Sequence, residues 1–173
     1  FFDKLEGFLN NASFAYMVIS HDRQFLEKAT ARTIEINLRY KDFTGSTMLL
    51  TDFFRKKIKE FVEQYSIDLL IAENCLTIPL HIPLALAITE YTAETGIPVI
   101  AHHHDFVWER KRFLLNCIAD YIHSAFPPNI HSIQHVVINS LAQSALASRC
   151  GLSSILVPNV MDYETETVPT DDY

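Results

Sequence analysis

Glycine, cysteine and long apolar runs are all scarce in this 173-residue chain, and each scarcity excludes a class of protein. With four glycines and no GxxxxGK[ST] motif, the chain has no phosphate-binding P-loop. Its three cysteines lie far apart without a CxxC pair, which excludes a disulfide framework and favours a reducing, cytoplasmic compartment. No apolar stretch reaches the roughly 18 residues of a membrane helix. The amino end lacks a signal-peptide pattern and an initiator Met, so we expect the cut end of a longer cytoplasmic protein.

Positive charge is also in short supply. The chain has 14 Lys and Arg against 21 Asp and Glu, a formal net charge of −7. Nucleic-acid backbones are bound through clustered Lys and Arg, so we do not expect nucleic acid as a partner. Hydrophobic residues make up 49% of the chain, which predicts a folded core rather than disorder.

Short apolar runs alternate with helical patterns along the whole chain. The predicted strands are Phe14–Ser20, Arg32–Leu38, Asp68–Ala72, Pro98–Ala101, His135–Ile138 and Ser154–Val157. The predicted helices are 23–29, 52–65, 83–95, 108–126 and 141–149. This alternation predicts a Rossmann-like, three-layer α/β sandwich with a mainly parallel sheet of about six strands. We expect one domain over residues 1–164 and a loose acidic tail over residues 165–173.

The densest group of chemically active side chains follows the strand predicted at Pro98–Ala101. His102, His103, His104 and Asp105 come directly after it in the sequence. In an open α/β sheet, ligands bind beyond the carboxyl ends of the strands. The position of this cluster therefore predicts a functional site.

Two alternatives for the histidines stay open. Consecutive side chains on a strand point to alternating faces, so all three imidazoles line one pocket only if the backbone turns there. In the first, His102 and His104 share a face, and Asp105 then adds an oxygen ligand for a metal ion. His131 and His135 are spaced as HxxxH, but the segment between them predicts a strand entry, where the pair would not share a face. We expect no dedicated metal site and no cofactor, with a His-cluster metal-binding protein as the less favoured alternative.

Four blocks of this sequence resemble the amino-terminal half of GT-B retaining glycosyltransferases of the family-4-like kind. The blocks are residues 68–88 (DLLIAENCLTIPLHIPLALAI), 96–113 (GIPVIAHHHDFVWERKRF), 135–151 (HVVINSLAQSALASRCG) and 154–164 (SILVPNVMDYE). The resemblance runs from about residue 53 to residue 164. In that family two Rossmann-like domains face each other; the first mostly holds the acceptor and the second mostly holds the sugar nucleotide. The resemblance implies sugar transfer, with a nucleotide sugar and an acceptor as partners.

The resemblance also implies roles for individual residues. His104 and Asp105 would be catalytic and lie near the transferred sugar, and Arg110 would contact a phosphate or carboxylate. The other substrate-binding residues would be His102, His103, Glu73, Asn74 and Asn139. The family's donor-binding second half is not among these residues, so the chain alone is expected to be inactive and to need a carboxyl-terminal donor-binding domain. An apolar face left for that domain predicts self-association.

Residues 5–38 resemble a different family, the switch-histidine region of ABC-F type ATPase domains. The resemblance rests on the sequence Ser20-His21-Asp22-Arg23 after a predicted strand. Because the chain has no P-loop, His21 has no nucleotide to sense, and we interpret this segment as structural. The chain would then be a chimera. A catalytically silent α/β interaction module, or such a chimera, is the alternative to a glycosyltransferase domain.

Overall fold

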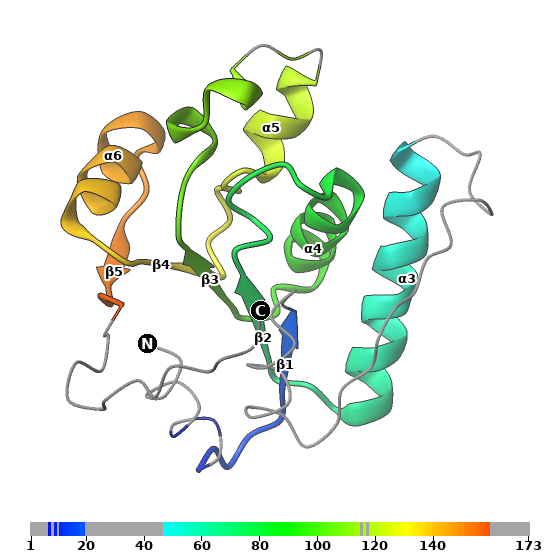
Figure 1. The fold of residues 1–173 in the computed structure, drawn as a ribbon. Coiled ribbons are helices and arrows are strands. Elements are labelled where there is room, and N and C mark those ends of the chain that lie inside the picture. Colours follow the sequence, from blue (N-terminus) through cyan, green and yellow to red (C-terminus); the bar gives the residue numbers. More distant parts are fainter. Residues whose placement is uncertain are drawn as a thin grey trace, which may run out of the picture.

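The computed structural model describes residues 7, 9, 11–19, 47–114, 116 and 118–159 of the chain. In this part, five strands form one sheet in the order β1-β2-β3-β4-β5, and every neighbouring pair is parallel (Figure 1). The strands are β1 (Tyr16–Ile19), β2 (Leu69–Glu73), β3 (Val99–His103), β4 (Ile133–Val137) and β5 (Ser154–Leu156). The predicted parallel α/β fold is confirmed.

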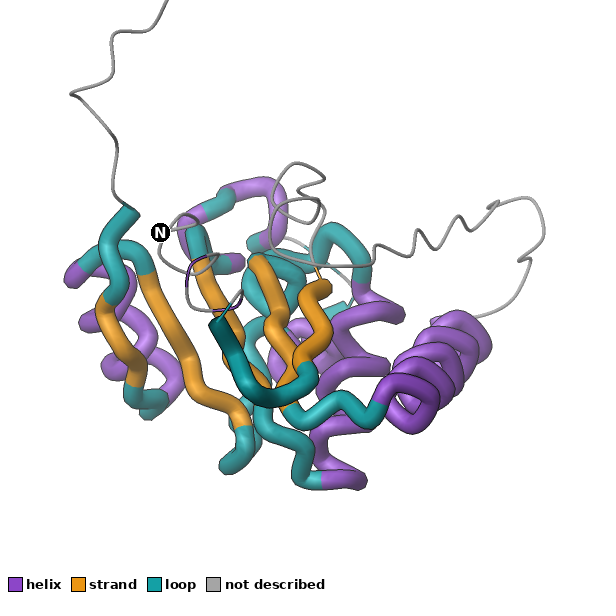
Figure 2. Tube along the Cα trace, turned by 90° about the horizontal axis from the view of Figure 1, so that it is seen from below, coloured by secondary structure: helices purple, strands orange, loops and turns teal. Residues whose placement is uncertain are grey.

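Each described strand overlaps a predicted one, and the count is five rather than six for a simple reason. The strand predicted at Arg32–Leu38 lies outside the described residues, as do the helix predicted at 23–29 and the tail at 165–173. Strand β1 pairs with β2 through Tyr16 opposite Leu69, so the amino-terminal segment belongs to the same sheet as the rest. Figure 2 shows the strands side by side from a direction perpendicular to that of Figure 1.

Among the described residues, four helices connect the strands: α3 (Thr47–Tyr65), α4 (Ile82–Thr95), α5 (Ala119–Ala125) and α6 (Ser140–Cys150). Parallel crossovers are right-handed, and here each crossover advances the sheet in the same direction, which places all four helices on one face. Their apolar side chains pack against that face of the sheet, and α6 forms a smaller cluster with the end of β4. The opposite face carries a separate apolar cluster made by Leu9, Tyr16, Val18, Leu69, Ile71 and Ile100.

Local signals explain where α4 and α6 begin and end. The Nδ1 atom of His81 accepts a hydrogen bond from the Leu84 amide at 3.2 Å, which caps the first turn of α4. Gly96 ends the helix with φ of 68°, a left-handed conformation that glycine adopts without steric cost. Helix α3 begins at Thr47, about one turn before the predicted start, so Thr51 lies inside the helix rather than capping it.

The prediction of one long helix over residues 108–126 is wrong. Among its described residues, this stretch forms two short 3₁₀ turns, η2 (Val107–Glu109) and η3 (Lys111–Phe113), and only α5 is α-helical. Between the two turns, Arg110 is extended, with φ of −114° and ψ of 101°. The ring of Phe106 is fully buried and stacks on Trp108 with centroids 4.5 Å apart. This aromatic stack packs against α6, and that tertiary contact outweighs the local helical pattern.

None of the helices in the described residues is long and apolar enough to cross a membrane.

Candidate functional site

Strands β2 and β3 end side by side, and their last residues build the centre of the site. Glu73 lies opposite His102 in the parallel register, on the face of the sheet away from the four helices. The two carboxylate oxygens of Glu73 lie 2.9 and 2.8 Å from His102 Nδ1. Both residues are buried, with 2% and 0% of their surfaces exposed. A carboxylate is therefore held in the interior by an imidazole from the neighbouring strand.

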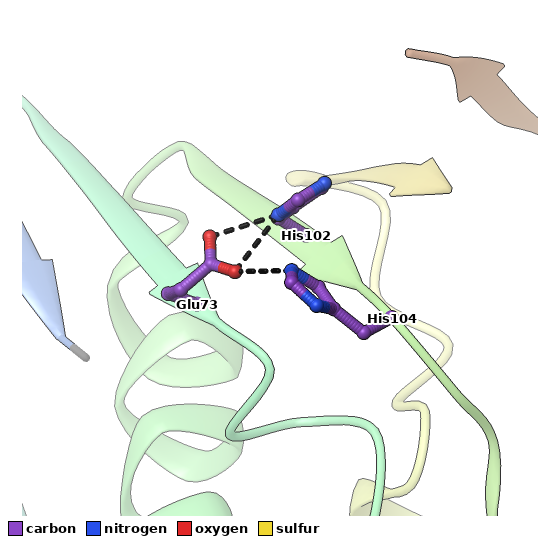
Figure 3. Close-up of side chains that lie close together, drawn as sticks. All are labelled: Glu73, His102 and His104. Carbon is purple, nitrogen blue, oxygen red and sulfur yellow. Dashed lines mark hydrogen bonds and ion pairs between the residues drawn. The ribbon is translucent and has the colours of Figure 1, made fainter. Parts of the chain in front are cut away.

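His104 joins this pair from the first position beyond β3. Its Nε2 atom lies 2.8 Å from Glu73 Oε1, and its side chain is 31% exposed. Figure 3 shows the two imidazoles directed toward the same carboxylate. The strand alternation thus gives His102 and His104 a common face, and the carboxylate between them comes from Glu73 of β2 rather than from Asp105. We call Glu73, His102 and His104 the rim cluster.

Asn74 locks the backbone around the rim cluster. Its amide donates to the carbonyl of His102 at 2.9 Å, and its Oδ1 atom accepts from the amide of His104 at 3.2 Å. Asn74 has φ of 54°, in the left-handed region that asparagine adopts more readily than most residues. The ends of β2 and β3 are therefore tied together at the point where the three side chains meet.

The charges of the rim cluster support one another. Burial by itself raises the pKa of Glu73, but the hydrogen bonds from His102 and His104 outweigh it, and the pKa lies below its usual value. The hydrogen bond to Glu73 raises the pKa of His104 and outweighs the opposite effect of partial burial. The carboxylate can accept hydrogen bonds from the hydroxyl groups of a ligand, and the imidazole of raised pKa can donate to them.

Asp105 and Arg110 form a second charged pair at the same end of the sheet. Arg110 Nε donates to Asp105 Oδ2, and the two side chains are 54% and 18% exposed. The guanidinium has five N–H donors, of which this contact uses one. The structure thus brings Asp105 to Arg110 and not to the rim cluster.

His103 points to the helix-bearing face and is fully buried. Its Nδ1 atom lies 2.8 Å from Thr77 Oγ1, and its Nε2 atom lies 2.9 Å from His135 Nδ1. The pKa of His103 is well below its usual value because of burial and the neighbouring imidazoles. Burial likewise lowers the pKa of His135 to about 4. Sequence reasoning grouped His103 with the substrate residues and missed its partners Thr77 and His135.

Asn139 is also separated from the rim cluster in its contacts. It follows β4, and its Oδ1 atom accepts a hydrogen bond from the Ala142 amide at 2.8 Å, capping α6. The side chain remains exposed, but its oxygen is committed to the helix. The resemblance implies a substrate-binding role for Asn139, and the contacts show a helix cap.

Comparison with known proteins connects the chain to sugar-transfer enzymes. It is 36% identical over 148 residues to a mannosylglucosylglycerate synthase of Petrotoga mobilis, covering 79% of this chain and 34% of that protein. It is 32% identical over 142 residues to a mannosylglucosylglycerate synthase of Thermotoga maritima, covering 77% of this chain and 32% of that protein. The chain therefore spans about a third of the length of these curated relatives. No family model and no solved structure matches the chain. Both relatives are glycosyltransferases, so sugar transfer is the general activity of the proteins that this chain resembles.

Proposed function

We propose that this chain is the acceptor-side domain of a retaining GT-B glycosyltransferase. The observation that carries the proposal is its 36% identity to part of a mannosylglucosylglycerate synthase, in a chain with a parallel sheet and a polar rim cluster. A parallel sheet binds ligands beyond the carboxyl ends of its strands, which is where Glu73, His102 and His104 lie. A second, donor-binding domain would supply the nucleotide sugar. We expect no catalytic turnover by the 173 residues alone.

His104 and Asp105 are the residues that we propose to act on the transferred sugar. In a retaining transfer, positive charge develops at the anomeric carbon and negative charge on the leaving phosphate. His104 is half-buried and hydrogen-bonded to Glu73, which fixes its ring and favours donation to a sugar hydroxyl. Asp105 would accept from a second hydroxyl while it orients Arg110. Oriented contacts of this kind are worth about 3 to 4 kcal/mol each when they act on developing charge.

The name of the relatives suggests the acceptor class. Mannosylglucosylglycerate contains a glycerate group, whose carboxylate needs a cationic partner. We propose that this chain binds a sugar linked to such a small hydroxy acid, with Arg110 at the carboxylate. Its side chain is 54% exposed and can form a forked contact with a carboxylate. His102, Glu73 and Asn74 would support this site, whereas burial favours a structural role for His103.

A binding experiment tests this proposal. Glucosylglycerate at ten times its Kd should stabilise the chain by about 1.4 kcal/mol, which is about 3 to 6 °C in melting temperature for a domain of this size. Arg110→Gln should abolish the shift. Arg112→Gln removes the same charge two positions away at an exposed site and should preserve it.

Two results would count against sugar binding here. The first is the absence of a shift in the unchanged chain, which would favour a catalytically silent interaction module. The second is an equal shift with free glycerate and glucosylglycerate, which would mean that the sugar is not recognised. A graft of residues 5–38 from an ABC-F domain and self-association of the chain are further proposals, independent of this result.

A further inference from the structure

We propose that Glu73, His102 and His104 bind one divalent transition-metal ion of the zinc type. The rim cluster offers one carboxylate oxygen and two imidazole nitrogens, and these ligand atoms all lie within 4.8 Å of one another. Imidazole nitrogen and carboxylate oxygen are the donors that zinc binds in sites with three protein ligands. The proposal goes beyond sugar transfer and does not rest on it, because the donor set and its geometry carry it.

The distances within the cluster are close to those of a bound ion. Zinc holds nitrogen and oxygen ligands at about 2.0 to 2.2 Å, so tetrahedral ligand atoms are about 3.4 Å apart. Glu73 Oε1 lies 2.9 Å from His102 Nδ1 and 2.8 Å from His104 Nε2. Each contact would open by about 0.6 Å for an ion to enter between the atoms. Rotation of the three side chains would provide this change, since all the ligand atoms already lie within 4.8 Å of one another.

The backbone already holds the three donors in position. Glu73 and His102 are register partners on neighbouring strands, and both are buried. Asn74 bonds to the backbones of His102 and His104 and so fixes the third ligand relative to the other two. Two ligands from strands and one from a locked turn make a site that needs little ordering on binding.

One member of the rim cluster is partly exposed to solvent. The side chain of His104 is 31% exposed, whereas those of His102 and Glu73 are 0% and 3% exposed. The His104 Nε2 atom itself is buried, so an ion would reach the carboxylate when the His104 ring turns toward solvent. Three protein ligands leave at least one coordination position for water or for a ligand oxygen. Asp105 is paired with Arg110, so it is not needed as a fourth ligand.

A cluster held only by hydrogen bonds is the competing interpretation. In that state, protons on His102 Nδ1 and His104 Nε2 would occupy the space that an ion would take. The metal-site interpretation predicts that the chain binds added Zn²⁺, and the hydrogen-bond interpretation predicts that it does not. A titration therefore distinguishes them.

Calorimetric titration of the metal-free, full 173-residue chain with Zn²⁺ is the direct test. We expect one ion per chain with a Kd of about 1 μM or below, the weakest binding that we would accept for three donors already in place. Co²⁺ should give the visible absorption bands of a four- or five-coordinate ion with nitrogen and oxygen ligands. Glu73→Gln and His104→Ala should each weaken binding by about 100-fold or more, since even residues that only support a ligand account for about 10- to 100-fold.

Matched controls remove an imidazole elsewhere. His123→Ala and His131→Ala alter exposed histidines outside the cluster and should bind Zn²⁺ like the unchanged chain. Circular dichroism checks the fold of each variant. If Glu73→Gln is unfolded, the His104→Ala variant, which changes a half-buried residue, is the deciding test. The proposal is overturned by the absence of binding, by binding that survives His104→Ala, or by binding that is lost in either control.

Discussion

Neighbouring histidines in β3 have opposite environments, because successive strand residues face opposite sides of the sheet. His102 contacts the carboxylate of Glu73, whereas His103 contacts the hydroxyl of Thr77 and the ring of His135. The Pro128 carbonyl beside His135 can only accept a hydrogen bond. This favours one direction, in which Thr77 donates to His103 and His103 donates to His135. Both imidazoles in this chain of bonds are neutral, so they serve the core rather than acid–base chemistry.

The neutral state of His135 predicts a loss of stability in acid. Its pKa falls from 6.5 to about 4 on folding, so the unfolded chain binds more protons below pH 6.5. The contribution of neutral His135 to the free energy of unfolding is complete above pH 6.5 and is lost as the pH falls toward 4. We expect His135 by itself to contribute a decrease of about 2 to 3 kcal/mol in the free energy of unfolding from about pH 7.5 to about pH 4.5. Urea denaturation across this range measures it.

The matched variant for this effect is His135→Gln. Glutamine can still accept from His103 but does not titrate, so the decrease in acid should become smaller by about the same 2 to 3 kcal/mol. His123→Gln removes an exposed imidazole and should leave the pH dependence unchanged. An identical pH dependence in His135→Gln and in the unchanged chain would contradict the assignment.

At the scale of elements, helix α6 shows how a residue just after a strand can cap the next helix. Asn139 closes β4 and caps α6, and Gly151 ends the helix with φ of 68°. The cap matters because the first turn of a helix has amide groups without intrahelical partners. Asn139 therefore marks the point at which the connection after β4 ends and α6 begins.

Replacing the α6 cap should have a measurable cost. Asn139→Ala should lower the free energy of unfolding by about 1 kcal/mol, since alanine offers no acceptor to the Ala142 amide. Asn139→Asp should retain most of the stability, because aspartate caps as well as asparagine. Ser140→Ala changes the next residue and should cost less than about 0.5 kcal/mol. Equal losses in the alanine and aspartate variants, measured in urea, would show that Asn139 does not act as the cap.

Sequence patterns predicted most of the elements but only part of the site. Apolar runs and caps located β2, β3, α4 and α6, since those signals are local. The helix expected over residues 108–126 failed because the stack of Phe106 on Trp108 depends on α6, about 30 residues further along the chain. Alternation suggested that His102 and His104 share a face. The carboxylate of Glu73 came from another strand, and no local pattern specifies that register.

At the scale of the whole molecule, the sheet separates the apolar clusters on its helix-bearing face from the cluster on the opposite face. The larger cluster on the helix-bearing face joins the sheet to α3, α4 and α5, and it includes Leu70, which is fully buried in β2. Ile71, the next residue, belongs to the cluster on the opposite face. Strand β2 is therefore buried on both sides, as is typical of a strand inside a parallel sheet.

Leu70→Ala tests how much the packing of β2 contributes to stability. The cavity left in the larger cluster should lower the free energy of unfolding by about 2 to 5 kcal/mol. Leu141→Ala makes the same chemical change at a side chain that is 80% exposed and should alter stability by less than about 0.5 kcal/mol. Urea denaturation compares the pair. Similar values for the two variants would mean that β2 is not central to the stability of this fold.

The simple order of the sheet also bears on how the protein forms. Every described strand docks beside the one that precedes it among the described strands, so none must wait for a later segment to fill a gap. Each new unit can add to an edge that already exists, and the entropic cost of the connection that it closes grows only slowly with the length of that connection. The rim cluster needs only β2, β3 and the turn after it, and it could thus assemble during synthesis before α6 has left the ribosome.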